Sequence, residues 1–460
     1  MPTKTNLGGV FMTDMDNRMS TGANISTEFV CGLIFDVNGI GTIDTLLTGD
    51  AAKNFANGNV VELNGISDIK DVGIDENQMC GLPYHHLKNF FTLAGEGQRL
   101  FVSFMDSNSD PDFSAIEKMQ LASGGIIYQI GVWTSKAIAK STSGEDGSYT
   151  VEGDSLLSKL QAQAELLGGK IGVTNFEGNQ PLNVLLNAPI IDSAIVDYSK
   201  LPDLTTLNLP KVSVFLGQPA TDAVHKIQLD LIKKSGETIK YVQVGNLGAV
   251  LACLAVAPVD VKIAYVANFN LSMVMTSCEL GFGNLTLNTK KDAFDESVVS
   301  FNNIKTISYT KRNTKLHQKG YNFLRDYEGL ENGVFISDDM TLSTGDYRSL
   351  TRCRTMHKAR RSVRLALLPM VNQAFEVDTS TGQLTDADVT VIRNAVYNAL
   401  DKNMVQPGTQ TTQISGREVT IDKSQNILEN DQLLIDFAIV PKGYASAIYV
   451  TEGFASSFSS

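Results

Sequence analysis

The residues best suited to chemistry are two adjacent histidines and two adjacent aspartates, and neither pair has the spacing of a known catalytic or metal-binding motif. His85 and His86 lie at the start of a predicted helix, where neighbouring side chains point in different directions and cannot easily share one metal ion. Asp338 and Asp339 lie in a predicted turn, and paired carboxylates act as general acid and base only across a cleft, so we interpret them as a solvated turn. The remaining histidines are isolated and are expected on the surface or at an interface: His225, His317 and His357.

The chain also lacks the sequence signatures of common enzyme classes. It contains no GxxxxGK[ST] phosphate-binding loop, no HExxH zinc motif and no GxSxG nucleophile motif. Its five cysteines are widely spaced and include no Cys-x-x-Cys pair, so neither a disulfide framework nor a structural zinc site is expected. The sequence therefore predicts no catalytic residue, no metal site and no cofactor.

Composition predicts a globular protein of two or three domains, because 460 residues with 43% hydrophobic content allow large cores. The formal charge of -12 argues against general binding to nucleic acid or to an anionic membrane surface. The most apolar stretch, Leu247 to Ala257, ends at Pro258 and is much shorter than the ~20 residues of a membrane span, so it predicts a buried helix and no membrane insertion. The scattered cysteines and the lack of an apolar signal segment in the first twenty residues predict that the protein folds and stays in a reducing cytoplasm.

Apolar runs that alternate with helical patterns predict an α/β fold for the first part of the chain. Each run is continuous rather than alternating, which is typical of strands covered on both faces in a parallel or mixed sheet. The helical patterns cover Tyr84 to Leu93 and Ser155 to Leu167. The predicted strands are FVCGLIFDV, RLFVSFMD, GGIIYQIGVWTS, PLNVLLNAPII and KVSVFLG.

A second unit is predicted to begin near Asn303, where the sequence becomes rich in threonine and asparagine. Its clearest helix starts at Thr385, whose hydroxyl is placed to cap the backbone near Asp388. Strands are predicted for Glu418 to Ile421 and for Leu433 to Val440, and the alternation in the second strand indicates a half-buried antiparallel strand. The buried face of the helix is predicted from the spacing of Val389, Ile392, Val396, Ala399 and Leu400.

The two ends of the chain are polar segments that each contain one short apolar run. Residues Met1 to Gly22 cannot form a core alone, so this segment is either a frayed terminus or an arm that awaits a partner. The apolar runs are Val10, Phe11 and Met12 near the start, and Ile448, Tyr449 and Val450 near the end.

A dense basic run lies between Arg352 and Arg364, with six Lys or Arg residues and no acidic residue. Neighbouring like charges on a helix repel by a few tenths of a kcal/mol per pair, so an acidic partner is expected. A solvated helix face is the alternative, and nucleic acid is disfavoured because no aromatic stacking platform accompanies the cluster. We favour contact with another protein molecule through Arg354, Lys358, Arg361 and Arg364.

The stretch GYNFLRDYEGLENGVFISDDMTLSTGDYRSL, followed by TRCRTMHKARRSVR, resembles the C-terminal assembly module of contractile tail sheath proteins. The block from EFVCGLIFDV to YHHLKNFFTLAGEGQRLFVSFMD is similar to the start of the sheath body. The resemblance implies layered α/β sheet domains, an α+β C-terminal module and extended arms at both ends. The implied segments are an arm over 1–22, an α/β body over 23–302 with a decorating insertion around 141–208, the assembly module over 303–446 and an arm over 447–460.

The resemblance also implies a structural role. Sheath subunits form a helical homo-polymer around an inner tube, join baseplate and terminator proteins, and contract to drive the tube through a target envelope. It implies assembly in the bacterial cytoplasm and a place in a phage tail or an injection-system particle. The apolar runs at the two ends would then be strands donated to neighbouring copies, and the basic run would contact the tube or a sister subunit. The alternatives are a tube or baseplate protein and a cytoplasmic α/β enzyme.

Overall fold

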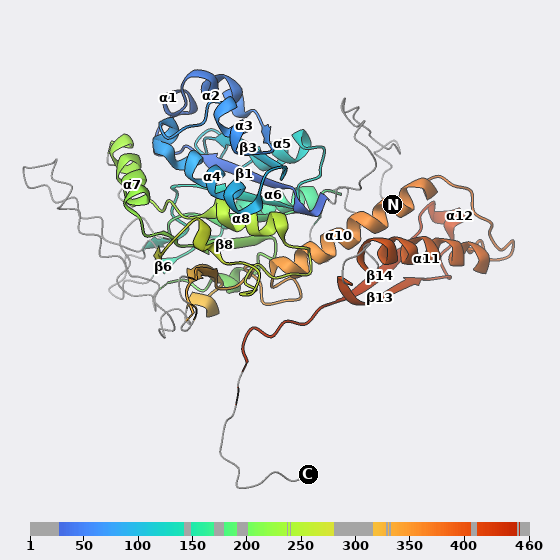
Figure 1. Cartoon of the computed structure of the whole chain (residues 1–460). Helices are drawn as coiled ribbons and strands as arrows, with labels where there is room; N and C mark the ends of the chain where they lie inside the picture. Colours follow the sequence, from blue (N-terminus) through green and yellow to red (C-terminus); the bar gives the residue numbers. More distant parts are fainter. Residues whose placement is uncertain are drawn as a thin grey trace, which may run out of the picture. The chain divides into compact units, whose positions relative to one another are not determined.

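The computed structural model describes residues 27–141, 149–169, 179–190, 201–236, 238–239, 241–279, 316–327, 330, 333–405, 412–448 and 450 (Figure 1). It divides into two compact units, a body of residues Met1–Arg364 and a C-terminal unit of residues Leu365–Ser460. The boundary falls inside one helix, α10 (Leu350–Leu367).

The body is built on an eight-stranded mixed sheet, which confirms the predicted α/β fold. The strand order is β12-β11-β8-β7-β4-β1-β3-β2, and the six inner strands are parallel while the two edge strands, β2 and β12, run antiparallel to their neighbours. The inner strands are almost fully buried because helices cover both faces, as continuous apolar runs predict. The strands are β1 (Cys31–Asp36), β2 (Val61–Leu63), β3 (Leu100–Met105), β4 (Gln129–Trp133), β7 (Asn183–Asn187), β8 (Val212–Leu216), β11 (Tyr321–Arg325) and β12 (Phe335–Ile336).

Two hydrophobic cores lie on opposite faces of this sheet. On one face, α4 (Leu82–Ala94) and α8 (Leu247–Val256) pack against Leu33 and Trp133, and α8 is the buried helix that the sequence predicts. On the other face, α5 (Ala115–Ala122) and α6 (Leu156–Gly168) pack against Ile34 and Val132. The remaining elements of the body are α1 (Ile43–Leu46), α2 (Gly49–Asn54), α3 (Ile66–Asp71), α7 (Asp222–Lys234), β5 (Lys140–Ser141), β6 (Tyr149–Thr150), β9 (Gln218–Pro219) and β10 (Cys278–Glu279).

The compact units differ from the segments predicted from the sequence. Strand β11 pairs in parallel with β8, so the polypeptide returns to the body sheet after residue 303, where the second unit was predicted to begin. Strand β7 pairs with β4 and β8 in the middle of the sheet, although it lies inside the predicted insertion at 141–208. That part of the predicted insertion therefore belongs to the core of the body.

The C-terminal unit is a helix packed on a two-stranded antiparallel sheet. Helix α11 (Asp386–Leu400) begins after Thr385, whose hydroxyl accepts a hydrogen bond from the Asp388 amide at 3.3 Å, as predicted. Strands β13 (Ile414–Ile421) and β14 (Ile435–Pro441) pair with each other, and one face of β14 is half-buried while the other is exposed. Four of the five residues predicted from the helical spacing are buried, and Ala399 is half-buried; the buried residues are Val389, Ile392, Val396 and Leu400. A short helix, α12 (Ile427–Asn430), lies in the loop between the strands.

Within the described residues, no helix is both long enough and apolar enough to span a membrane. All five cysteines are free thiols, and four of them are buried.

Candidate functional site: a cationic helix and open strand edges

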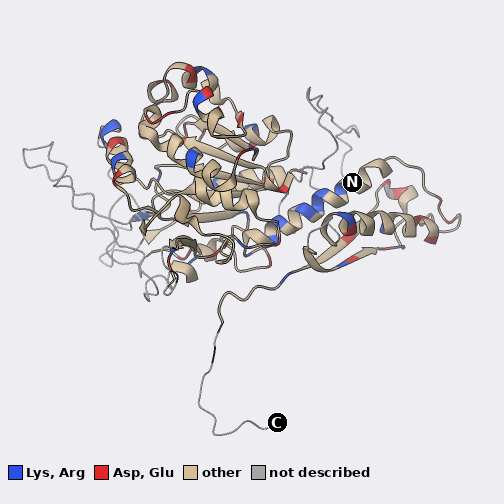
Figure 2. Ribbon diagram, in the orientation of Figure 1, with Lys and Arg blue, Asp and Glu red and all other residues tan. Residues whose placement is uncertain are grey.

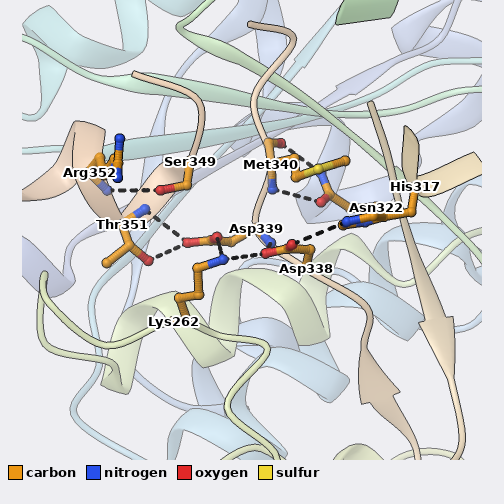
Figure 3. Close-up of polar contacts among 9 residues, drawn as sticks. All are labelled: Lys262, His317, Asn322, Asp338, Asp339, Met340, Ser349, Thr351 and Arg352. Carbon is orange, nitrogen blue, oxygen red and sulfur yellow. Dashed lines mark hydrogen bonds and ion pairs between the residues drawn. The ribbon is translucent and has the colours of Figure 1, made fainter. Parts of the chain in front are cut away.

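The start of helix α10 is fixed by an aspartate from the loop that precedes it (Figure 3). The carboxylate of Asp339 accepts hydrogen bonds from the backbone amide of Thr351, at 3.0 Å, and from the Thr351 hydroxyl. The carbonyl oxygen of Asp339 accepts a further bond from the Leu350 amide at 2.7 Å. Amides in the first turn of a helix have no partner within the helix, so Asp339 supplies the missing acceptors.

Lys262 ties the same loop to the body. Its ammonium lies 2.6 Å from Asp338 Oδ1 and 3.2 Å from Asp339 Oδ1, and both carboxylates are buried. Burial opposes ionisation of Asp338, but the nearby charge of Lys262 outweighs it and lowers its pKa. Burial dominates at Asp339 and raises its pKa. The prediction of a solvated turn at these two aspartates is therefore wrong, because they form a buried ionic anchor for α10.

Further along α10, positive side chains meet the carboxyl ends of the helices that cover the sheet (Figure 2 shows Lys and Arg along this helix). Arg354 donates to the carbonyl oxygens of Leu254 at 3.0 Å and Ala257 at 2.8 Å, at the end of α8. Arg360 donates to the last residue of α6, Gly168, at 2.6 Å. The last carbonyls of a helix lack partners and carry the negative end of the helix dipole, so these cations satisfy them.

Arg361 makes similar contacts with the segments that lead into strands β4 and β7. Its guanidinium donates to the carbonyl oxygens of Gly125 at 2.7 Å, Ile127 at 2.8 Å and Pro181 at 3.0 Å, just before β4 and β7. Its Cζ atom lies 4.3 Å from the ring centroid of Tyr128. In a parallel sheet of this kind, the ends of helices and the starts of strands lie along the same sheet edge, and α10 follows that edge.

These contacts argue against the predicted role of Arg354, which is only 1% exposed and donates to carbonyl oxygens inside the body. Arg361 is half-buried and donates to carbonyl oxygens of the body, and Lys358 forms an ion pair with Glu28. Arg364 is exposed. For Arg361, Lys358 and Arg364, contact with a tube or a sister subunit stays a prediction. Part of the counter-charge that the basic run was predicted to need comes from the carboxyl ends of α6 and α8 and from the carboxylate of Glu28.

The sequence analysis missed two buried charged residues of this region: Glu28, which pairs with Lys358 of α10, and Lys211. Lys211 donates to carbonyl oxygens of Ala164 and Gly169 at the end of α6, and burial lowers its pKa to about 8. Burial, with Lys211 and nearby arginines, also holds the pKa of His357 well below its ordinary value, so this histidine is not at the surface as predicted. The spacing of apolar residues could not predict that these polar side chains are buried. The buried face of α10 itself includes a charged residue, Arg354.

Of the two adjacent histidines, His86 ties α4 to the start of α8. Gly248 donates its amide to Nδ1 of His86 at 3.2 Å, so Nε2 carries the proton and donates to the carbonyl oxygen of Val244 at 3.0 Å. Burial holds the pKa of His86 well below its ordinary value. Among the described residues, no group of three or more His, Cys, Asp or Glu side chains is arranged to hold a metal ion.

The place where α/β proteins usually bind ligands is covered by the chain itself. Ligands bind such folds at the carboxyl ends of the parallel strands. Here the buried segment 241–246 lies at the ends of two of these strands, β4 and β7: Trp133, at the end of β4, donates to the carbonyl oxygen of Val244 at 3.1 Å. Asn187, at the end of β7, lies so close to Gly245 that a Cβ atom there would be 2.3 Å from its amide group.

The C-terminal unit has strand edges with no partner in the described part of the chain. Strands β13 and β14 pair only with each other there, which leaves the outer edge of each strand without a strand partner. Beyond β14, Ile448 and Val450 lie outside any strand, and they are 80% and 82% exposed. The other residues of the predicted donated strands lie outside the described residues: Val10, Phe11, Met12 and Tyr449.

Comparison with known proteins gives one family match and several structural matches. Residues 346–459 match the family model described as "DUF2586, C-terminal domain". No curated protein matches the sequence.

The structural matches cover almost the whole chain. The helical sheath of the anti-feeding prophage in its contracted state is 14% identical, with a TM-score of 0.53 over 98% of this chain and 100% of that one. The sheath complex of the extracellular contractile injection system PVC, also contracted, is 12% identical, with a TM-score of 0.52 over 98% of each chain. A chain of the anti-feeding prophage baseplate is 13% identical, with a TM-score of 0.51 over 98% of this chain and 99% of that one. Over nearly its whole length, the chain therefore has the fold of contractile sheath proteins.

Proposed function

We propose that this protein is a structural subunit of a contractile sheath, which polymerises helically around an inner tube and contracts to drive the tube through a target envelope. The observation that carries the proposal is the pair of open edges on the β13–β14 sheet, together with the exposed apolar residues that follow it. The fold shared with solved sheath chains supports it.

The open edges suggest how copies join. An unpaired strand edge is a template for a strand from another chain. The apolar run at Ile448 to Val450 is our candidate for a strand donated to one neighbour, and the run at Val10 to Met12 is the candidate for another. Each such contact joins different surfaces on the two copies, and the assembly is an open helix when the rotation between successive copies does not close a ring.

Contraction in this proposal needs no catalytic site. The extended sheath is held behind a kinetic barrier, and release lets the subunits move as rigid bodies into a lattice of lower free energy. Its partners are further copies of the chain, the inner tube, and the baseplate and terminator proteins. Assembly takes place in the bacterial cytoplasm, and the product is a phage tail or an injection-system particle. Lys358, Arg361 and Arg364 are our remaining candidates for contact with the tube or a sister subunit, and Arg364 is exposed.

The alternative of an α/β enzyme is disfavoured by the covered strand ends. Segment 241–246 occupies the edge at which such a fold would bind a substrate, and its hydrogen bonds to Trp133 and His86 hold it there. We infer that the fold serves assembly rather than catalysis.

Electron microscopy of two purified proteins tests the proposal. The full chain is expected to form long hollow tubes or stacked rings, whereas a chain that lacks residues 1–22 and 447–460 is expected to stay monomeric with an unchanged melting temperature. Tubes formed by the shortened chain would contradict strand exchange. Small closed oligomers formed by the full chain would contradict a sheath and favour an enzyme or a baseplate component.

A further inference from the structure

The first described turn of the chain is clamped by helix α10. Glu28 lies in the short 3-10 turn Thr27–Phe29 that precedes β1, and it is 2% exposed. Its carboxylate forms an ion pair with the ammonium of Lys358, whose side chain is 13% exposed. Its carbonyl oxygen accepts a 3.3 Å hydrogen bond from Arg354. Side chain and backbone of one residue are thus both held by the same helix.

The turn is also tied to the central sheet. The Val30 amide donates to the carbonyl oxygen of Thr27 at 3.1 Å, and the Tyr128 amide donates to the carbonyl oxygen of Val30 at 3.2 Å. Tyr128 in turn lies under the guanidinium of Arg361 from α10. Residues 1–26 therefore join the body at a point that α10 contacts through three cationic side chains, Arg354, Lys358 and Arg361.

A buried ion pair is an unusual way to hold a chain terminus. Removing charged groups from water is costly, and apolar residues of similar volume often stabilise a fold equally well or better. What the pair adds is a specific position, because the carboxylate of Glu28 must face Lys358 for either charge to be compensated. The cost of burying these two charges has a functional reason if the position of Glu28, next to the N-terminal segment, must be fixed.

We propose that Glu28 and Lys358 form the anchor of the N-terminal arm, which fixes where residues 1–26 leave the body and delivers to α10 the load that the arm carries between copies. The load-bearing part rests on the proposed function, whereas the anchoring part concerns the single subunit. Helix α10 is suited to receive a load because Asp339 and Lys262 secure its first turn and it continues into the C-terminal unit.

Hydrogen exchange on the monomer tests the anchor without reference to assembly. In Glu28→Gln and Lys358→Met, the Val30 amide is expected to exchange about tenfold faster or more, a factor equivalent to about 1.4 kcal/mol of local stability. Lys358→Arg should restore the wild-type rate. The double variant E28Q/K358M removes both charges, so it should recover the melting temperature while Val30 still exchanges fast. Lys53→Met breaks an exposed pair with Asp50 and should change neither quantity.

Unchanged Val30 exchange in both single variants would overturn the anchor. So would a double variant in which exchange and melting temperature recover together, because the pair would then serve only general stability.

The load-bearing part is tested on assembled protein. Tubes of E28Q are expected to lose subunits at a lower urea concentration than tubes of wild type or Lys53→Met, as measured by sedimentation. Equal resistance would show that the anchor carries no load. If the wild-type chain forms no tubes, the proposed function fails and the load-bearing part fails with it, while the exchange results still decide the anchor.

Discussion

Arg354 donates a 2.8 Å hydrogen bond to the carbonyl oxygen of Ala257, just beyond the end of α8 and 97 positions away in the sequence. The same kind of contact recurs at Arg360, which donates to the last residue of α6, whereas Lys358 pairs with the carboxylate of Glu28. Part of the counter-charge of this basic segment is thus supplied by the helix dipoles of its own body.

Replacing Arg354 with methionine is expected to destabilise the body by about 1–3 kcal/mol, because carbonyl oxygens at the end of α8 would stay buried without a donor. Urea unfolding followed by circular dichroism measures the change. Arg364→Met on the same helix is the matched control, and its exposed side chain predicts a change within about 0.5 kcal/mol. Equal effects of the two substitutions would contradict the account of α10 given above.

The Asp338 and Lys262 pair predicts how stability depends on pH. The charge of Lys262 prevails over burial and lowers the pKa of Asp338 in the folded protein below its ordinary value of 3.8. Between these two pKa values the unfolded chain binds more protons than the folded one, so stability rises with pH. The stability that Asp338→Asn removes should therefore be fully present at pH 7 and should shrink as the pH falls from 3.8 through the lowered pKa. Denaturant unfolding at a series of pH values measures it. Asp346→Asn, at an exposed position of the same loop, is the control, and a difference for Asp338→Asn that does not change with pH would contradict the assignment.

Helices α4 and α8 pack so closely at Gly248 that only glycine fits. A Cβ atom there would lie 2.0 Å from the carbonyl oxygen of His86, which is far inside van der Waals contact. Gly248→Ala is therefore expected to cost about 1–3 kcal/mol through overpacking, although alanine is the better helix former. Gly153→Ala is the control, because no atom lies within 4 Å of its Cβ position. Equal melting temperatures of the two variants would show that α4 and α8 can move apart to accommodate the added methyl group at no cost in stability.

The sequence predicted those parts of the molecule in which one kind of residue repeats. The inner strands β1, β3, β4, β7 and β8, the buried helix at Leu247 and the cap at Thr385 all follow from local patterns of burial and hydrogen bonding. The contacts of the candidate site could not be predicted in this way, because they join residues that are far apart in the chain. A charge at Arg354 has the same sequence signature whether it faces water or the end of a helix, and the burial of Asp339 depends on Lys262, 77 positions earlier by residue number. The domain boundary differed for the same reason, since the pairing of β11 with β8 is visible only in three dimensions.

The last prediction concerns the exposed apolar residues after β14. In the proposed sheath, Ile448 and Val450 are buried against a neighbouring copy, and burial of one such side chain is worth about 1.5–3 kcal/mol. The double variant Ile448→Lys and Val450→Lys should therefore raise the critical concentration for tube assembly about tenfold or more, as measured by sedimentation of the polymer. Its melting temperature as a monomer should not change, because both side chains are exposed within one subunit. Met273→Lys introduces one positive charge at a residue of the body that is 73% exposed, and it should assemble like wild type. If the two proteins assemble equally well, the end of the chain is not a donated strand.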